Sequence, residues 1–413
     1  MSFQPSIPLS YCTNVHAGVD LDSIRANLRQ YAAEVLQRLR GTGNWESLGV
    51  GLWIPDVASS QLLEGSHLAD FAEFLSDQEF VALTINGFPF DNFHGDSVKQ
   101  RVYLPSWAEH ARFDYTCRLA KILTGLLPVQ QTTGSISTLP IGWPNNPFAA
   151  SGNDGSLNEA IIKHAGAKLR QLAEFLDALL DRTGKRIVVA IEPEPGCLLD
   201  TADDVVDFFE KELPKQRHRE FITVCHDICH SVVMKESQRD AIDRYLQAGI
   251  TVGKVQVSNA IVVPWDEIDE AEHAATLAEL SGFAEDRYLH QTGCIDATGA
   301  FSLHDDLPAL IRKHRGAERV LDQSWRIHFH VPIFVESFGR LHTSRSAVQE
   351  CLAALSEVDN ARKFTGHFEV ETYAWTVLPP EWRQRGLAAD IAKEMEWLRD
   401  QLSVQVSKNL AKR

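Results

Sequence analysis

Short apolar runs rich in β-branched residues alternate along the chain with longer amphipathic stretches. Runs of the first kind are typical of buried strands, and apolar positions at three- and four-residue steps are typical of helices. The expected strands cover residues 9–15, 48–54, 80–85, 137–142, 185–195, 220–227, 252–260, 325–334 and 366–375. The expected helices between them include residues 22–40, 157–182, 202–212, 236–248 and 345–356. Strands that alternate with helices in this way predict a parallel α/β architecture.

The alternation predicts an α/β fold of the (β/α)8 TIM-barrel type, built as a single domain over residues 1–413. A closed barrel needs eight strands, so one of the nine expected strands is misassigned or lies outside the barrel. An irregular, glycine-containing stretch at about 261–320 predicts an insertion before the last strands. The charged segment at about 380–413 predicts a C-terminal helical extension that packs on the outside.

The chain has 40 basic and 56 acidic residues, so its formal net charge is −16 at pH 7. A surface of this sign repels a phosphate backbone, and we therefore expect no nucleic-acid partner. Seven cysteines, an odd number spread along a long chain, do not form a disulfide framework and favour a reducing compartment. The N-terminus lacks the pattern of a signal peptide, and no run reaches the roughly 18 apolar residues of a membrane span. We therefore expect a cytoplasmic protein.

Acidic side chains and histidines follow several of the expected strands, at the end of a barrel where active sites are built. Glu192 and Glu194 come directly after an apolar strand, and both should point to the same side, where prolines stop the strand. The next strand ends in Asp227, with His230 three residues further on. The alternative interpretations are solvated acids at a strand end, and a helix-capping aspartate beside a core histidine.

Two later strands also carry polar side chains on one face. His328 and His330 share one face of an otherwise apolar strand, and Glu369 and Glu371 share one face of the last strand. Buried imidazoles and carboxylates have a desolvation cost unless a cation or a hydrogen-bond partner compensates it. The alternatives are a structural pair of histidines and an exposed polar strand face.

The ends of these strands would meet in one barrel mouth, where they supply three carboxylates and one imidazole. The predicted metal ligands are Glu192, Asp227, His330 and Glu371. An oxygen-rich set of this kind suits Mn²⁺ or Mg²⁺ best, with Co²⁺ or Zn²⁺ as alternatives. Open coordination positions would remain for two substrate oxygens.

Further polar side chains lie in the loops that follow the first and third expected strands. They are Asn14, His16, Asn86, His94 and Lys99. Loops over a barrel mouth commonly hold substrate, so we expect these residues to contact a small polyol, sugar or cyclitol-like metabolite. A solvated charged loop is the alternative interpretation.

With these residues in place, the chain resembles the xylose-isomerase-like TIM barrels, a superfamily that includes sugar isomerases, ketose 3-epimerases and endonuclease IV. Glu192, Asp227 and Glu371 match the metal ligands of the epimerases, and His230 matches their substrate-binding histidine. The pattern departs at strand seven, where the epimerases have a histidine ligand and this chain has Gln256. Either Gln256 coordinates through its amide oxygen, or His330 takes the place of that histidine.

Within this superfamily, long sequence blocks resemble the metabolite traffic protein EboE family. The blocks include LSYCTNVHAG, IEPEPG, CHDICHS, HFHVPIF and HFEVETYAWTVLP, and they are spread over nearly the whole chain. The resemblance implies a barrel encoded beside a prenyltransferase-like membrane protein, which is then a candidate partner. It also implies a role in the biosynthesis or trafficking of a secondary-metabolite precursor.

Together these observations favour a divalent-metal-dependent isomerase or epimerase acting on a sugar or cyclitol. The metal would polarise a substrate carbonyl and stabilise the enediolate that forms when the α-proton leaves. Glu192 and Glu371 would be the catalytic base and acid, while His230, Gln256 and His328 would contact the substrate. The alternatives are a metal-dependent phosphoester hydrolase of the endonuclease IV-like branch, and a non-catalytic carrier that binds the metabolite.

Overall fold

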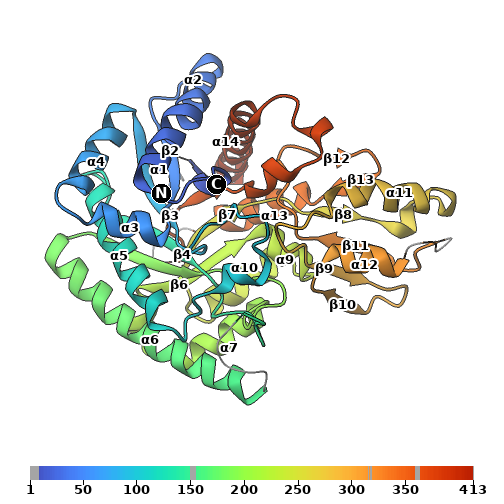
Figure 1. The fold of residues 1–413 in the computed structure, drawn as a ribbon, viewed down its shortest axis with the longest axis horizontal. Coiled ribbons are helices and arrows are strands. Elements are labelled where there is room, and N and C mark those ends of the chain that lie inside the picture. Colours follow the sequence, from blue (N-terminus) through green and yellow to red (C-terminus); the bar gives the residue numbers. More distant parts are fainter. Residues whose placement is uncertain (1–8, 149–154, 315, 317–318, 359–362, 413) are drawn as a thin grey trace.

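The computed structural model describes residues 9–148, 155–314, 316, 319–358 and 363–412. Eight parallel strands close into a barrel in the order β1-β14-β7-β6-β5-β4-β3-β2 (Figure 1). They are β1 (Ser10–Cys12), β2 (Leu48–Trp53), β3 (Phe80–Asn86), β4 (Thr133–Thr138), β5 (Arg186–Ile191), β6 (Ile222–Asp227), β7 (Val252–Val257) and β14 (Phe368–Val370). The barrel closes because β1 pairs with both β14 and β2. The predicted (β/α)8 barrel is therefore confirmed.

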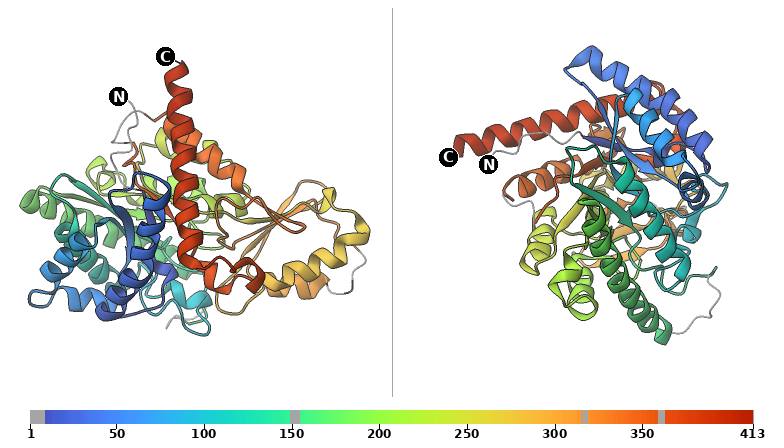
Figure 2. Two further views of the ribbon diagram at one scale, coloured as in Figure 1. Left: turned by 90° about the horizontal axis from the view of Figure 1, so that it is seen from above. Right: turned by 90° about the vertical axis from the view of Figure 1, so that its left-hand side faces the viewer.

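Helices connect the barrel strands and cover the outside of the barrel (Figures 1 and 2). The predicted helix at 22–40 is observed as α1 (Leu21–Asn27) and α2 (Ala33–Thr42), joined by a π-helical stretch. The others around the barrel are α3 (Asp56–Leu62), α4 (His67–Asp77), α5 (His110–Leu126), α6 (Gly155–Thr183), α7 (Ala202–Glu212), α8 (Gln216–Arg219), α9 (Ile228–Val233), α10 (Gln238–Gln247) and α13 (Arg345–Ser356).

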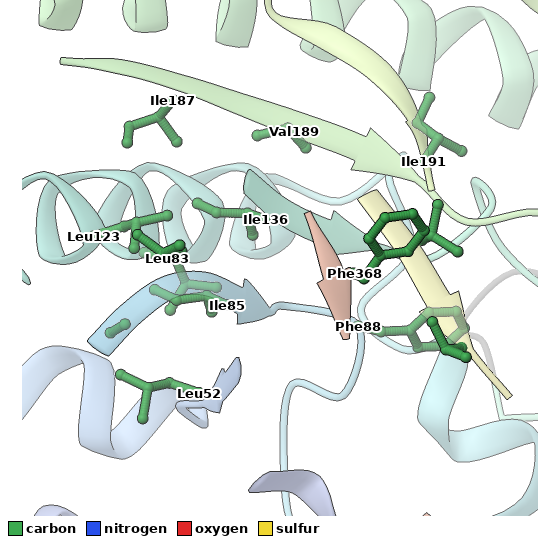
Figure 3. Packing of buried hydrophobic residues seen from close by; sticks show 14 of the residues in the cluster. Leu52, Leu83, Ile85, Phe88, Leu123, Ile136, Ile187, Val189, Ile191 and Phe368 are labelled. Carbon is green, nitrogen blue, oxygen red and sulfur yellow. The ribbon is translucent and has the colours of Figure 1, made fainter. Parts of the chain in front are cut away.

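Side chains alternate along each barrel strand between the barrel interior and the surrounding helices. The outward positions are aliphatic, and they pack with helix side chains in one large buried cluster (Figure 3). Leu52, Ile85 and Val189 are examples from three strands, and Leu123 of α5 packs against this layer. The main apolar core therefore lies between the barrel and its helices.

The barrel interior is polar by contrast. The Nζ atom of Lys254 on β7 donates a hydrogen bond to Oε1 of Glu369 on β14 at 2.7 Å, and both side chains are fully buried. The hydroxyl of Thr84 on β3 donates to the other carboxylate oxygen of Glu369. Nearby, the Ser135 hydroxyl and the His367 ring are hydrogen-bonded at 2.8 Å. Part of the polar face predicted for the last strand is thus neutralised by a lysine.

Between β7 and α13 the chain forms a second, antiparallel sheet of six strands in the order β10-β9-β11-β8-β13-β12. Its strands are β8 (Ile261–Val263), β9 (Thr292–Ile295), β10 (Phe301–His304), β11 (Ser324–Ile327), β12 (Ser337–Phe338) and β13 (Leu341–Thr343), and its helices are α11 (His273–Leu280) and α12 (Leu307–His314). This inserted sheet continues past residue 320, where the insertion was expected to end. Figure 1 shows it beside the barrel.

The strand predicted at 325–334 was expected in the barrel, and this placement is wrong. It is observed as β11, which pairs antiparallel with β8 and β9 and is the surplus ninth strand. Trp325 and Ile327 pack in a second apolar cluster with Trp265. A two-residue apolar period shows that a strand is half buried, but it does not show which sheet the strand joins.

The fourth barrel strand lies earlier than the predicted range 137–142. Its inward positions are Ser135 and Ser137, so it lacks the apolar pattern of its neighbours. The strand ends before Pro140, and Ile141 has a φ of 70°, a left-handed conformation that does not continue a strand.

The last helix, α14 (Leu387–Lys412), packs along the outside of the molecule, as predicted for the C-terminal segment. Its buried face carries Ile391, Met395 and Leu398. Figure 2 shows its C-terminal end projecting beyond the body of the barrel. Across the described residues, no helix has the length and apolarity required to traverse a membrane.

Candidate metal and substrate site

Three carboxylates meet at the carboxyl ends of the barrel strands. Glu192 directly follows β5, Asp227 is the last residue of β6, and Glu371 directly follows β14. Each offers a carboxylate oxygen, and these three oxygens lie within 4.8 Å of one another. All three side chains are buried. Strand alternation, which places every second side chain inside the barrel, brings them together.

Hydrogen bonds hold two of these carboxylates in place. Oδ1 of Asp227 accepts bonds from the backbone N–H of His230 at 3.0 Å and from the Ser258 hydroxyl at 2.7 Å. Oε1 of Glu371 accepts bonds from the side-chain amides of Asn14 and Asn86, each at 2.8 Å. The predicted polar residues Asn14 and Asn86 therefore orient a carboxylate of the site.

Several polar side-chain atoms at this place are buried and have no hydrogen-bond partner among the residues that the structure describes. They are Oε2 of Glu192, Oδ2 of Asp227, Nε2 of His330 and both side-chain amide atoms of Gln256. The Nδ1 atom of His330 donates a hydrogen bond to the carbonyl oxygen of Glu371 at 3.1 Å. Nδ1 therefore carries the proton, and Nε2 has a free lone pair. Buried polar atoms are almost always satisfied, so the two carboxylate oxygens, the His330 nitrogen and the amide oxygen of Gln256 fit a divalent cation, whereas the amide NH₂ of Gln256 does not.

The protonation of the carboxyl groups is strongly perturbed. Burial, together with the charges of Glu371 and Asp227, raises the pKa of Glu192 well above its usual range. Burial and the neighbouring Asp227 raise the pKa of Glu371 to about 8. Burial also acts to raise the pKa of Asp227, but the nearby imidazoles and the hydrogen bonds from the His230 backbone and the Ser258 hydroxyl together outweigh it, and the pKa is lowered. Without a cation, the cluster therefore holds protons at neutral pH.

A second group of ligand atoms lies beside the first and comes from Glu194, His230 and His328. The Nδ1 atom of His230 donates to the Pro193 carbonyl oxygen at 2.7 Å, which leaves its Nε2 as an acceptor. The Nδ1 atom of His328 donates to Oε1 of Gln291 at 2.7 Å, because the amide nitrogen of Gln291 is bonded to the Pro195 carbonyl oxygen. The two Nε2 atoms then face each other as acceptors at 3.2 Å, a contact that a proton or a cation between them would stabilise.

Two supporting contacts of the site were not expected. Glu194 accepts a hydrogen bond from the Tyr103 hydroxyl at 2.8 Å. Glu394 of α14 accepts bonds through one oxygen from the backbone N–H of Ile333 at 3.0 Å and from the Thr372 hydroxyl at 2.6 Å. The second contact joins the segment that carries His330 to the segment that carries Glu371. The shared strand face of Glu192 and Glu194 predicts that Glu194 lies near the site, but it does not predict the contact with Tyr103, and no sequence pattern pointed to Glu394.

A cavity of about 510 Å³, counted with the space that opens to solvent, lies over these groups. Most of the predicted site residues line it: Asn14, Asn86, Lys99, Glu192, His230, His328, His330 and Glu371. Lys99 is paired there with Asp306, which lies between β10 and α12 of the insertion. His328 and His330 follow β11 as irregular chain, so their shared face does not come from a strand as expected.

Four other predicted residues are not among those that line the cavity. Asp227 and Gln256 lie deeper, in the barrel interior. His16 stacks on Tyr31 with ring centres 4.6 Å apart. The His94 ring bonds the backbone carbonyl oxygen of Asn14 at 2.7 Å and has a supporting position. The structure thus does not bring His16 and His94 to the expected substrate space.

No protein-family model and no curated protein matches this chain. Among solved structures, a xylose isomerase-like TIM barrel protein from Mycobacterium smegmatis in complex with magnesium is 13% identical, with a TM-score of 0.51 over 97% of this chain and 98% of that chain. A xylose isomerase domain protein from Alicyclobacillus acidocaldarius is 11% identical, with a TM-score of 0.45 over 96% and 99% of the two chains. The IOLI protein with a bound zinc atom is 12% identical, with a TM-score of 0.44 over 97% and 99%.

At these identities the likeness concerns the fold alone. It agrees with the closed barrel of eight parallel strands and the helices between them. The chain has the fold of the xylose isomerase-like TIM barrel proteins.

Proposed function

We propose that this protein is a divalent-metal-dependent isomerase or epimerase that acts on a small sugar or cyclitol. The observation that carries the proposal is the convergence of Glu192, Asp227 and Glu371, whose ligand atoms lie within 4.8 Å of one another under an open cavity. The magnesium of the Mycobacterium smegmatis protein with the same fold is consistent with a divalent ion at this place.

The residues that would hold the cation are Glu192, Asp227, His330 and Glu371, with the amide oxygen of Gln256 as a further donor. Three carboxylates and one imidazole suit Mn²⁺ or Mg²⁺, and the imidazole also allows Co²⁺ or Zn²⁺. When bound, such an ion polarises a carbonyl and its neighbouring hydroxyl.

The proton transfer itself belongs to Glu192 and Glu371. Their strands, β5 and β14, are separated by β6 and β7, so the two carboxylates approach the cavity from different sides. One removes the proton next to the carbonyl, and an enediolate forms. Return of the proton to the opposite face of the same carbon gives an epimer, and return to the neighbouring carbon gives an isomer.

Three further residues position the substrate or a catalytic carboxylate. The Nε2 atom of His230 is an acceptor beside the carboxylates, so it binds a substrate hydroxyl. Asn14 and Asn86 fix one oxygen of Glu371 and leave the other for the reaction. A carboxylate held in this way loses little conformational freedom during proton transfer.

A second candidate function is metal-dependent phosphoester hydrolysis. The observation that favours it is the second ligand group, Glu194, His230 and His328, next to the first. Two adjacent cations would stabilise both the attacking and the leaving oxygen of a phosphoester. The negative charge of the chain argues against a nucleic-acid substrate for such a reaction.

The sequence resemblance to the EboE family adds a cellular context to the proposal. In that context the substrate is a secondary-metabolite precursor, and a prenyltransferase-like membrane protein is a partner. This part of the proposal rests on the sequence blocks alone.

The proposal is tested by measuring metal content and proton exchange together. The Mn²⁺-loaded protein is incubated in D₂O with a panel of ketoses and inososes, and deuterium at the carbon next to the carbonyl is followed by NMR. We expect exchange that is lost in Glu192→Gln and Glu371→Gln and kept in the exposed control Glu64→Gln. Tight binding without exchange would contradict the isomerase and support a carrier, and release of phosphate with two metals per chain would support the hydrolase.

A further inference from the structure

We propose that Glu194, His230 and His328 form a second cation site, beside the first, and that this site takes Zn²⁺. The ligand atoms of the three residues lie within 4.8 Å of one another, and all three side chains are buried. The inference goes beyond the proposed function, which needs only the ion at the first site. Because the two sites have different ligands, the second does not depend on the reaction at the first.

The two imidazoles are spaced as zinc ligands are. The Nδ1 atom of His230 donates to the Pro193 carbonyl oxygen, and Nδ1 of His328 donates to the amide oxygen of Gln291. Both Nε2 atoms therefore carry a lone pair, and they are 3.2 Å apart. Two nitrogens that bind one tetrahedral zinc ion at about 2.0–2.1 Å are themselves separated by about 3.3 Å. The observed separation is thus close to the one that a bound zinc ion requires.

The third ligand, Glu194, has one carboxylate oxygen to spare. Its Oε1 atom accepts hydrogen bonds from the Tyr103 hydroxyl at 2.8 Å and from the amide nitrogen of Gln291 at 3.3 Å. Its Oε2 atom is buried and has no partner among the described residues. A proton shared by the two rings would leave this oxygen unpaired. The Tyr373 hydroxyl, 3.3 Å from Nε2 of His328, can donate to one nitrogen only, whereas one cation serves the carboxylate and both nitrogens.

Gln291 orients two of the three ligands at once. Its amide nitrogen donates to Glu194, and its amide oxygen accepts the hydrogen bond from His328. A partner of this kind on the far side of an imidazole is typical of metal-binding histidines, because it fixes the ring and its tautomer. The insertion carries both Gln291 and His328, so it contributes a ligand and the group that holds that ligand in place.

The charge of the region also favours a second cation. Four buried carboxylates belong to the two groups, and they are those of Glu192, Glu194, Asp227 and Glu371. The buried ammonium of Lys254 is already paired with Glu369. When all four carboxylates are ionised, one divalent ion leaves two negative charges and two divalent ions leave none. Buried charge without compensation is costly, so the second ion removes a cost that the first ion leaves.

The ligand types decide which ion the second site takes. Two imidazoles and one carboxylate are a ligand set of catalytic zinc, which keeps a fourth position open. The carboxylate-rich first site favours Mn²⁺ or Mg²⁺ instead. Glu194, His230 and His328 all line the cavity, so a substrate oxygen can reach the open position. With zinc bound, the substrate hydroxyl assigned to His230 becomes a ligand of the ion.

The test counts both metals on the same protein. The full-length protein is loaded with one equivalent of Mn²⁺, one equivalent of Zn²⁺ is added, unbound ions are removed by gel filtration, and both metals are measured by elemental analysis. We expect one Mn²⁺ and one Zn²⁺ per chain. When Co²⁺ replaces Zn²⁺, the protein should show the strong visible absorption of a tetrahedral ion.

Two substitutions separate the sites. Glu194→Gln and His328→Leu should each weaken zinc binding at least about a hundredfold and leave Mn²⁺ bound, because loss of an outer partner of a ligand already costs about 10- to 100-fold. Retained Mn²⁺ shows that a variant is folded, and Glu194→Gln replaces His328→Leu if the latter does not fold. The matched controls are Glu64→Gln and His110→Leu, the same changes at exposed positions, which should keep both ions.

The outcomes distinguish this inference from the proposed function. A single ion per chain, of either kind, would overturn the second site and leave the proposed function standing. Two ions per chain with zinc affinity unchanged in both variants would also overturn it, because the zinc would then lie elsewhere. Binding of no divalent ion by the parent protein would overturn the second site and the proposed function together.

Discussion

Replacing Glu192 by glutamine should stabilise the protein when no metal is bound. The Glu192 carboxylate shares its buried cluster with Asp227 and Glu371, within 4.8 Å. At an effective dielectric constant of about 20, two unit charges at this separation repel each other by about 3.5 kcal/mol. Together with burial, this repulsion raises the pKa of Glu192 well above its usual value of 4.5.

The sign and size of the effect follow from this shift. The folded state binds the Glu192 proton more tightly than the unfolded state, so folding stability falls as pH rises above the unfolded pKa. The loss is about 1.4 kcal/mol per pH unit, which sets a ceiling of about 4 kcal/mol at pH 7.5. Glutamine avoids this loss, but its NH₂ group adds a donor that costs about 1–3 kcal/mol if it is unpaired. We expect a net gain of about 1–3 kcal/mol at pH 7.5 and none at about pH 5.

The assay is urea unfolding of chelator-treated parent and Glu192→Gln proteins at both pH values. Glu64→Gln, the same change at an exposed position, should shift stability by less than about 0.5 kcal/mol. Addition of Mn²⁺ should reverse the order, because the parent gains stability from the bound ion and the variant lacks a ligand. A metal-free variant that is less stable than the parent at pH 7.5, or a difference that does not change with pH, would refute the reasoning.

Three further predictions concern the same region. Metal affinity should rise as pH increases to about 8, the raised pKa of Glu371, because binding displaces the protons of Glu371 and Glu192; titration calorimetry in buffers of different ionisation enthalpy should show proton release, and a flat profile would contradict it. Lys254→Met should destabilise the protein by about 3–5 kcal/mol in urea unfolding, because Glu369 is left buried and unpaired, and the double variant with Glu369→Gln should recover part of this loss. Gly51→Ala should also destabilise, because an added Cβ would overlap the Glu369 carboxylate; a normal unfolding midpoint would show that Glu369 moves aside.

The barrel could be predicted because its outward strand positions are aliphatic and its helices are amphipathic. These two periods are local properties of the chain. The carboxylates were predictable for the same reason, since a polar residue at the end of an apolar run such as Glu192 interrupts a clear pattern. Where the inward positions are small and polar, as at Ser135 and Ser137 of β4, the pattern is weak and the strand was displaced in the prediction.

The remaining parts of the site depend on contacts between distant segments. The sequence around Trp325 predicts a strand, but only the pairing with β8 and β9 shows that this strand belongs to the inserted sheet. His328 was expected on a strand face, and its actual position is set by Gln291 from another part of the insertion. The supporting roles of His94 and Glu394 follow from the same kind of long-range contact.

The contact of Glu394 links the end of the chain to the completion of the site. All barrel strands, up to Val370, are synthesised before the 26 residues of α14. A nascent chain can therefore close its barrel while the segments that carry His330 and Glu371 still lack their common anchor. A stop codon or a proteolytic cut before Leu387 would leave all barrel strands present but remove Glu394. We therefore expect the shortened protein to bind the metal more weakly than the protein with an intact α14.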